Sequence, residues 1–343
     1  MNKSQILIDC VYLNSEGGKK ILEIILNNLE SRLSFKHSFL FDDRIDKNIL
    51  RILRSNEINL IKPSEIERRS FYIANKSKFK KVVCLANVPP PINLESNVLI
   101  YFHNDLLLKP TKSGSFKSML ILLVKKIYIK YKNADRYKWI VQTNFMKDKL
   151  SFSFGINKNK IETLPIFKEL LPETGIKKSK RSFLYVCSTA KHKNLTRLIE
   201  AFNLIENPKD LDLYLHLTIN DDTYFIKNIF SKNTNHRLKI INHGIVNQPT
   251  LNSLYSKSEF LIFPSLIESF GLPLIESVGY ACKVIASDLT YVYQVIQPSI
   301  KFNPYLPKSI AKAIDEAILD NNIPDSKLII KNKIDKFIDL IDN

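Results

Sequence analysis

The sequence predicts an α/β protein built from two doubly wound, Rossmann-like domains. Short apolar runs alternate with segments of helical periodicity along the chain, which is the pattern of parallel β–α–β units. A polar, charged stretch containing Pro172 and Gly175 interrupts this pattern, and we interpret residues 168–180 as a linker. The expected domains are residues 1–167 and 181–343, and the last helix is a candidate to pack back on the first domain. A chain of 343 residues is long enough for two such cores.

The first domain contains short apolar runs of strand length and three longer periodic segments. Strands are expected at residues 5–13, 37–41, 58–61, 81–86, 98–103 and 139–143. Helices are expected at residues 18–33, 64–74 and 116–132.

The second domain repeats the alternation. Strands are expected at residues 183–187, 211–219, 238–241, 259–263 and 283–287. Helices are expected at residues 194–205, 251–256, 273–280, 307–319 and 327–341.

Composition indicates a globular cytoplasmic protein. The chain is 45% hydrophobic and 25% charged, which excludes a disordered protein. Its four cysteines are far apart and form no Cys-x-x-Cys pair, which argues against a disulfide framework and a zinc site. No run of 18 apolar residues is present, so no transmembrane helix is expected, and the N-terminal run is too short for a signal peptide.

The net charge of +17 indicates an anionic partner, such as a nucleic acid, an anionic membrane or a phosphorylated substrate. The charge is unevenly distributed along the chain. Residues 101–150 alone hold 11 Lys or Arg against 3 Asp or Glu.

Residues 264–276 carry the most specific functional pattern. An apolar strand at 259–263 leads into them, and Pro273 begins an expected helix. Gly271 allows close backbone approach, and a helix N-terminus offers N–H groups to an anion such as phosphate. Glu268 and Glu276 cannot bind phosphate, so we expect them to bind hydroxyls. Phosphate and hydroxyls together suggest a nucleotide sugar, and the alternative is an ordinary strand–helix connection with surface glutamates.

The pattern Pro-Ser-x-x-Glu-Ser-Phe-Gly-Leu-Pro-x-x-Glu resembles the donor-site signature of retaining glycosyltransferases of family 4, which have the GT-B fold. This resemblance implies two facing Rossmann-like domains with a cleft between them. It also implies that Glu268 lies against the donor sugar and Glu276 binds the ribose. The N–H groups around Phe270, Gly271 and Leu272 would face the diphosphate.

A basic turn after the strand at 183–187 is a second candidate donor-site segment. Lys191, His192 and Lys193 precede an expected helix, and positive charge there would stabilise a departing diphosphate. The stretch resembles the family motif Gly-Arg-x-x-x-x-Lys-Asn, and Lys193 matches its lysine. Cys187 and Ser188 stand at the glycine and arginine positions, so Lys191 is the candidate substitute for the arginine. A solvated basic loop is the alternative.

His103 ends the strand expected at 98–103 and Asn104 follows it, at the end of a strand where α/β sites are commonly built. By resemblance to the family, His103 would line the active site near the sugar, and we assign Asn104 to the acceptor side. A purely structural histidine is the alternative.

Three further glycines belong to the predicted donor site by resemblance. Gly244 matches the glycine that begins the family's base-binding loop, so Gly244 and Ile245 would contact the base. Gly17 and Gly18 follow the first strand, where family members have a glycine-rich loop near the diphosphate. Taken alone, a Gly-Gly pair is often only a turn.

The helix expected at 116–132 is basic and amphipathic. Leu120, Val124, Ile127 and Tyr131 form one stripe. The lysines around it that we assign to an acceptor or a membrane are Lys117, Lys125, Lys126 and Lys130. Such a helix fits an anionic membrane surface. Alternatively, the helix buries the stripe in its own domain.

The sequence therefore predicts a retaining glycosyltransferase of the hexosyltransferase type. It would transfer a sugar from a nucleotide diphosphate sugar to a glycan hydroxyl, lipid-linked in our prediction, during synthesis of capsule, O-antigen or lipopolysaccharide. We expect it on the inner face of the plasma membrane, without a nucleic-acid partner. Asp210 and Asp212 resemble a metal-binding Asp-x-Asp pair but open a strand, so no metal or other cofactor is expected. The alternatives are a nucleotide-sugar binder without transferase activity and a basic nucleic-acid-binding protein.

Overall fold

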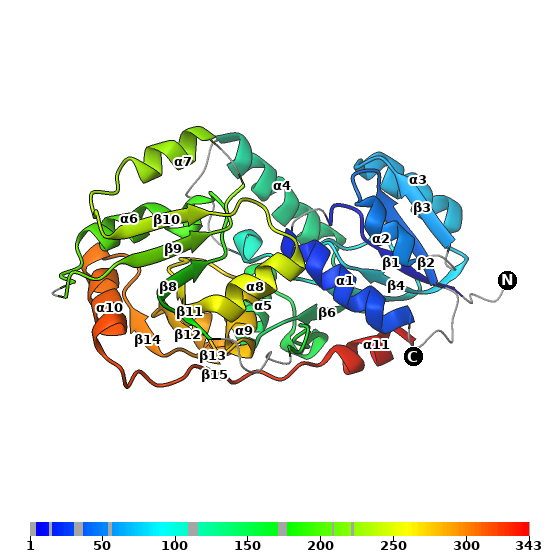
Figure 1. The fold of residues 1–343 in the computed structure, drawn as a ribbon. Helices are drawn as coiled ribbons and strands as arrows, with labels where there is room; N and C mark the ends of the chain where they lie inside the picture. The colour runs from blue at the N-terminus through cyan, green and yellow to red at the C-terminus, as the bar shows by residue number, and fades with distance from the viewer. Residues whose placement is uncertain are drawn as a thin grey trace. The chain divides into compact units, whose positions relative to one another are not determined.

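A computed structural model describes residues 5–13, 16–30, 37–53, 57–108, 116–170, 177–207, 209–220 and 223–342. The chain divides into two compact units, which are Met1–Lys168 with Lys331–Asn343, and Glu169–Ile330. Each unit consists of a parallel sheet with helices packed against it (Figure 1). The predicted α/β class with two doubly wound sheets is confirmed.

The first unit contains a seven-stranded sheet in the order β3-β2-β1-β4-β5-β6-β7. Its strands are β1 (Gln5–Asp9), β2 (His37–Asp42), β3 (Glu57–Ile61), β4 (Phe79–Cys84), β5 (Asn97–Tyr101), β6 (Lys138–Val141) and β7 (Ile161–Thr163). All neighbouring strands are parallel. The strand order reverses direction at β1 and β4, and ligands of α/β proteins bind beside the carboxyl ends of strands at such a point.

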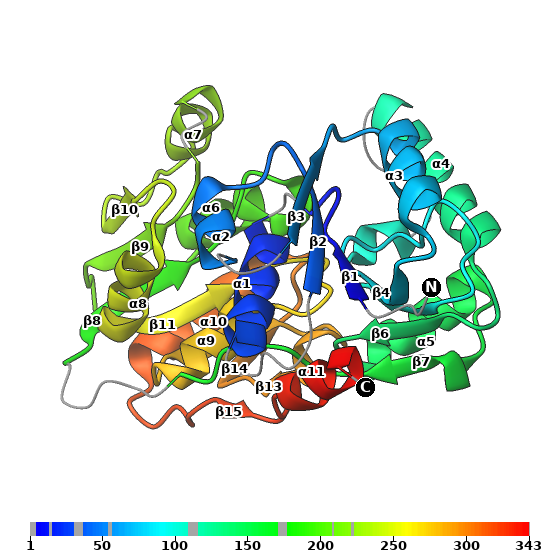
Figure 2. The ribbon, with the colours of Figure 1, turned by 90° about the vertical axis from the view of Figure 1, so that its right-hand side faces the viewer.

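Helices cover both faces of this sheet (Figure 2), and a hydrophobic core lies on each face. The helices are α1 (Glu16–Glu30), α2 (Lys47–Ile52), α3 (Glu65–Asn75), α4 (Phe116–Lys132), α5 (Asn144–Phe154) and α11 (Ile334–Asp342). Helices α1 and α11 contribute to the core on one face, and α3, α4 and α5 to the core on the other.

The C-terminal helix α11 belongs to the first unit. Phe337, Ile338 and Ile341 are fully buried in the core that α1 also lines. The ammonium group of Lys81 in β4 donates to the carbonyl oxygens of Leu340 at 2.7 Å and Ile341 at 3.0 Å. These bonds satisfy carbonyl groups that a helix end leaves without partners.

The prediction of a helix over residues 327–341 is wrong for the first half of that range. Lys327–Leu328 forms strand β15, antiparallel to β13 (Ile296–Gln297). The backbone N–H of Ile329 also donates to the carbonyl of Val295 at 3.0 Å. These strand partners lie about 30 positions away in the sequence, so local periodicity could not reveal them.

The second unit repeats the topology of the first. Its six-stranded sheet has the order β10-β9-β8-β11-β12-β14, and the strands are parallel. The strands are β8 (Ser179–Tyr185), β9 (Leu213–Leu217), β10 (Leu238–Asn242), β11 (Ser258–Phe263), β12 (Lys283–Ser287) and β14 (Ile300–Phe302). The helices are α6 (Leu195–Asn203), α7 (Thr223–Phe230), α8 (Gln248–Lys257), α9 (Leu272–Gly279) and α10 (Pro307–Leu319). The direction reverses at β8 and β11, which makes their carboxyl ends the expected ligand site.

None of the helices in the described part of the chain has the length and apolar character needed to cross a membrane.

Candidate active site

Both donor-site segments predicted from the sequence lie at the carboxyl ends of adjacent strands in the second unit. One segment follows β8 and the other follows β11, and these two strands pair directly. The backbone N–H of Leu266 donates to the carbonyl of His192 at 2.8 Å. The Tyr185 hydroxyl joins the segments as well, since it donates to the Lys193 carbonyl at 2.5 Å and lies 3.1 Å from Oγ of Ser265.

Lys193 and Glu268 form an ion pair across the two segments. The distance from Nζ to Oε1 is 2.5 Å, and the two side chains are 17% and 14% exposed. Two motifs that lie 75 positions apart therefore place a cation and a carboxylate in contact. Partial burial weakens solvent screening, so each charge orients the other more firmly than on an open surface.

Asn194 fixes the position of the basic turn. It adopts the left-handed conformation with φ of 60°, between a 3₁₀ turn at Lys191–Lys193 and helix α6. Its buried amide donates to the carbonyls of Pro264 at 3.2 Å and Pro304 at 2.7 Å. The matching asparagine of the motif thus holds the lysine turn against the second donor-site segment.

Gly271 precedes α9 in a conformation that favours glycine. Its φ is 79°, and a Cβ atom there would lie 3.0 Å from Cδ1 of Leu274. Phe270 is buried beside it. The first turn of α9 begins at Leu272, and the N–H groups of such a turn lack intrahelical acceptors and carry partial positive charge.

Glu276 lies on α9 and is buried, with an exposed fraction of 6%. Its Oε2 accepts a hydrogen bond from the hydroxyl of Tyr255 in α8 at 3.0 Å. Burial, together with the Glu276 carboxylate, raises the pKa of Tyr255 well above its ordinary value, so this hydroxyl remains a donor at neutral pH. Tyr255 belongs to no motif in the sequence, because only the packing of α8 against α9 gives it a role.

Ser188, which stands at the position of the family arginine, and Lys191, its candidate substitute, are both exposed. Burial raises the pKa of the neighbouring Cys187 thiol. A second cation contacts this turn, because the guanidinium of Arg197 donates to Oδ1 of Asn194 at 2.8 Å. Arg197 lies inside α6 and outside the motif, so the sequence pattern does not reveal its contact with the turn.

The predicted base-binding loop follows β10. Gly244 has a φ of 69°, and its N–H donates to Oδ1 of Asn242 at 3.2 Å, while Ile245 is exposed. His243 stacks on His216, and Nε2 of the first lies 3.0 Å from Nδ1 of the second. Burial lowers the pKa of both histidines.

In the first unit, β5 ends at Tyr101, two residues earlier than expected, and His103 and Asn104 lie just beyond its carboxyl end. Oδ1 of Asn104 accepts from the N–H of Leu106 at 3.1 Å, so this side chain stabilises the turn at Asp105–Leu108. Gly17 and Gly18 lie in the first turn of α1 and not in a loop before it. Because first-turn N–H groups lack intrahelical acceptors, this position stays compatible with the predicted role.

The stripe on α4 faces solvent. Leu120, Val124, Ile127 and Tyr131 are between 51% and 80% exposed. Ile129, on the opposite side of the helix, is fully buried in the first unit. The alternative in which the helix buries its stripe is therefore wrong.

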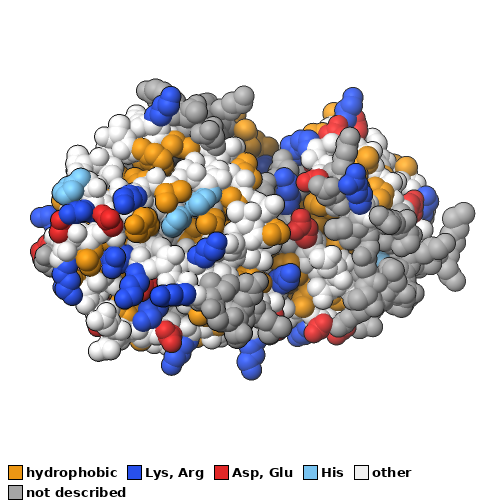
Figure 3. Space-filling model, viewed as in Figure 1, with side chains coloured by type: hydrophobic (Ala, Val, Ile, Leu, Met, Phe, Trp, Pro, Cys, Tyr) orange, Lys and Arg blue, Asp and Glu red, His pale blue; other side chains and the backbone are white. Residues whose placement is uncertain are grey.

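Lysines surround this stripe. Lys125 and Lys130 are exposed and Lys126 is partly exposed, whereas the side chain of Lys117 is outside the described residues. On the face shown in Figure 3, basic side chains are more frequent than acidic ones, in line with the net charge of +17.

Asp210 and Asp212 take part in surface ion pairs. Asp210 pairs with Arg237, and Asp212 lies 3.3 Å from Nζ of Lys239. Among the described residues, no group of three or more His, Cys, Asp or Glu side chains is arranged to hold a metal ion.

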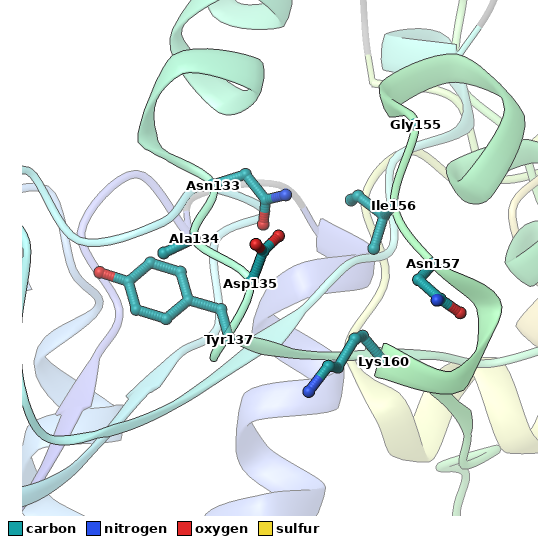
Figure 4. A pocket seen from close by; sticks show the side chains of 8 residues that line it. All are labelled: Asn133, Ala134, Asp135, Tyr137, Gly155, Ile156, Asn157 and Lys160. Carbon is teal, nitrogen blue, oxygen red and sulfur yellow. The ribbon is translucent and has the colours of Figure 1, made fainter.

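A hollow of about 300 Å³ lies in the first unit (Figure 4). Asn133 and Asp135 form one wall, and Ile156 and Lys160 form the other. These residues precede β6 and β7, so the hollow is at the amino ends of parallel strands. It is therefore at the sheet edge opposite His103.

The family model and the relatives that match this chain agree with one another. Residues 167–335 match the model of the family described as glycosyl transferases group 1. The O-antigen chain mannosyltransferase RfbU of Salmonella typhimurium is 24% identical over 212 residues, which cover 56% of this chain and 55% of RfbU. The serotype-specific mannosyltransferase WbdA of Escherichia coli is 31% identical over 85 residues, which cover 24% of this chain and 10% of WbdA. The chain thus spans about half the length of RfbU and a tenth of WbdA.

Solved structures confirm the fold. Anabaena HepE, whose structure contains UDP and glucose, aligns with a TM-score of 0.65 at 11% identity, over 92% of this chain and 90% of HepE. The alignment covers nearly the whole of both chains, so the similarity extends over both units.

Proposed function

Residues 167–335 belong to the glycosyl transferases group 1 family, which is a family of sugar-transferring enzymes. From this premise we propose a specific activity for the chain. The chain is a retaining glycosyltransferase that uses a nucleotide diphosphate sugar. The contact between Lys193 and Glu268 carries this proposal. It places a cation suited to a diphosphate beside a carboxylate suited to sugar hydroxyls.

In the proposed reaction, the bond between the sugar C1 and the diphosphate oxygen breaks. The acceptor oxygen bonds to C1 on the same face, and its proton passes to the departing phosphate oxygen. Lys193 and the N-terminus of α9 stabilise the developing negative charge on the diphosphate. Glu268 orients the sugar, and Glu276, held by Tyr255, binds the ribose hydroxyls.

The proposed acceptor is a glycan of a cell-surface polysaccharide such as O-antigen or lipopolysaccharide. RfbU is named an O-antigen chain mannosyltransferase, which supports this acceptor class. The structure of HepE with UDP and glucose supports a nucleotide sugar as the donor.

We further propose that α4 binds an anionic membrane and brings the active site to a lipid-linked acceptor. The exposed stripe of Leu120, Val124, Ile127 and Tyr131 supports this, because contiguous apolar surface is costly in water. Each lysine beside the stripe would contribute about 1 kcal/mol at an anionic surface. The enzyme would then act on the inner face of the plasma membrane.

The donor reaction is tested by nucleotide release in the presence of candidate nucleotide sugars and glycan acceptors. Lys193→Ala should lower turnover by about 100-fold to 1000-fold, the range for removing one group that stabilises transition-state charge. Glu276→Ala should mainly raise KM for the donor. Lys239→Ala is the matched control, since Lys239 forms an exposed ion pair on β10, and it should leave turnover unchanged. Wild-type kinetics in both site variants would overturn the assignment.

A second candidate is a protein that binds a nucleotide sugar without transferring it. The serine at position 188 favours this candidate, because it stands where the family motif has an arginine. The same assay separates the two functions. Donor binding without nucleotide release supports a binding protein, and release supports the transferase.

A further inference from the structure

Asn87 contacts His103 through both ends of its side-chain amide. Oδ1 of Asn87 accepts from the backbone N–H of His103 at 2.7 Å. Nδ2 of Asn87 lies 3.4 Å from Nε2 of the His103 ring. Asn87 lies in the loop between β4 and β5 and has no role assigned so far, whereas His103 follows β5 and is expected near the sugar.

The first of these contacts determines the orientation of the amide. A backbone N–H is only a donor, so the atom of Asn87 that meets it must be the oxygen. The NH₂ group then faces Nε2, and because NH₂ is only a donor, Nε2 must present its lone pair. A neutral imidazole with a lone pair on Nε2 carries its proton on Nδ1.

The second ring nitrogen of His103, Nδ1, does not oppose this placement of the proton. Nδ1 of His103 is buried without a hydrogen-bond partner in the described part of the chain. Either tautomer therefore leaves Nδ1 without a partner there, and Asn87 decides between them. Burial lowers the pKa of His103 to about 4, which keeps the ring neutral at physiological pH.

The loop that carries Asn87 is held rigidly. Asn87 is buried and has a φ of 69°, a conformation that asparagine tolerates better than most residues. Two positions later, the carbonyl of Pro89 accepts from the buried guanidinium of Arg68 at 3.0 Å. Arg68 is in turn paired with Asp9 at the end of β1.

We propose that Asn87 is a positioning residue that holds His103 as the Nδ1–H tautomer, so that Nε2 accepts a hydrogen bond from a sugar hydroxyl. The 3.4 Å separation marks a long and weak bond, which a ligand hydroxyl can share or replace. This role rests on the proposed glycosyltransferase function. In this role, Nε2 of His103 accepts a hydrogen bond from the sugar and cannot donate a proton.

The tautomer can be measured without substrate, by long-range ¹H–¹⁵N correlation spectra of the full chain labelled with ¹⁵N-histidine. His103→Asn identifies the signal among the six histidines. The wild type should show a protonated Nδ1 and an unprotonated Nε2. In Asn87→Asp, both carboxylate oxygens are acceptors, so the proton should move to Nε2.

Asn87→Gly is the matched variant, because glycine adopts the same backbone conformation without a side chain. It should show a mixture of tautomers. Sugar transfer should fall at least about tenfold in Asn87→Asp, the cost of one hydrogen bond to the substrate, and less in Asn87→Gly.

A protonated Nε2 in the wild type, or an unchanged tautomer in Asn87→Asp, would overturn the proposal. Unchanged transfer in an Asn87→Asp protein whose tautomer has switched would overturn the role of Nε2. If the wild type transfers no sugar, the proposed function fails, and the spectra still decide whether Asn87 sets the tautomer.

Discussion

At the scale of single residues, the first unit is organised around a buried ion pair. Arg68 and Asp9 are both almost fully buried, and a nitrogen and an oxygen lie 2.8 Å apart. The Tyr72 hydroxyl donates to the same Asp9 oxygen at 2.6 Å. Glu65 lies 3.7 Å from Arg68 and also accepts from Tyr128 of α4 at 2.5 Å. These contacts join the end of β1 to α3 and α4.

Arg68→Met should destabilise the first unit by about 3–5 kcal/mol, because it leaves the Asp9 carboxylate buried without its partner. Lys158→Met is the control, since Lys158 pairs with Asp148 and both side chains are exposed. This control should cost at most about 1 kcal/mol. Urea unfolding of both variants measures the difference, and equal losses of stability would contradict the role of the buried pair.

Stability should fall as the pH drops below about 6.5, the ordinary pKa of histidine. The folded pKa values of His216 and His243 are lowered, so the unfolded chain binds protons more readily there. By linkage, the stability these groups contribute is complete above that pH and is lost as the pH falls. His37 and His103 act in the same direction in the first unit.

The measurement is urea unfolding across a pH series, comparing the wild type with a His216→Gln, His243→Gln double variant. The second unit of the variant should lose less stability between about pH 7 and pH 5. An identical pH dependence in both proteins would show that the histidine pair is not responsible.

At the scale of elements, helix α4 combines two apolar sides. Ile129 anchors one side in the core, and the stripe on the other side is exposed. Periodicity predicted its bounds, residues 116–132, correctly. Periodicity could not say which apolar side faces the core, because the sequence contains apolar residues on both.

Leu120→Ser with Ile127→Ser should weaken binding to anionic vesicles by at least about tenfold, since each exposed aliphatic side chain is worth more than 1 kcal/mol when buried. Ile66→Ser, at an equally exposed position on α3, is the control and should bind like the wild type. Vesicle flotation measures the bound fraction. Equal binding of all three proteins would remove α4 as the membrane surface.

The candidate site was predictable where a function depends on a local motif. Lys193 and Glu268 were chosen from separate motifs, and the fold brings them into contact. Tyr255 and Asn87 were not predictable, because their roles arise from partners that only the folded chain supplies. Similarly, strand β15 depends on pairing with β13 and not on its own sequence pattern.

At the scale of the whole molecule, the chain builds the same doubly wound topology twice and then returns to the first unit through α11. The sequence-based boundary placed residues 331–343 in the second domain, with the last helix as a candidate to pack back on the first domain, and the helix does belong to the first unit. Helix formation is local, but the unit to which a helix belongs depends on which core buries it. Here Phe337 packs in the first core, 5.6 Å from the Tyr101 ring.

Phe337→Ala should destabilise the first unit by about 3–5 kcal/mol, the usual cost of removing a buried aromatic side chain. Phe152→Ala is the control in the same unit, because Phe152 is 93% exposed. Hydrogen exchange resolves the two units separately. Faster exchange in α1 and β1, with no change in β8 and β11, is expected in Phe337→Ala, and loss of protection in the second unit instead would contradict this packing.

We propose that the second unit binds a nucleotide diphosphate sugar between the turn at 187–194 and the turn at 264–276. Calorimetric titration with a panel of nucleotide sugars measures this binding. At least one of them should bind the wild type. Glu276→Ala should weaken that binding by at least about tenfold, the cost of a hydrogen bond to a charged group, and Lys239→Ala should leave it unchanged. Absence of binding by every member of the panel, or equal binding by Glu276→Ala, would contradict this proposal.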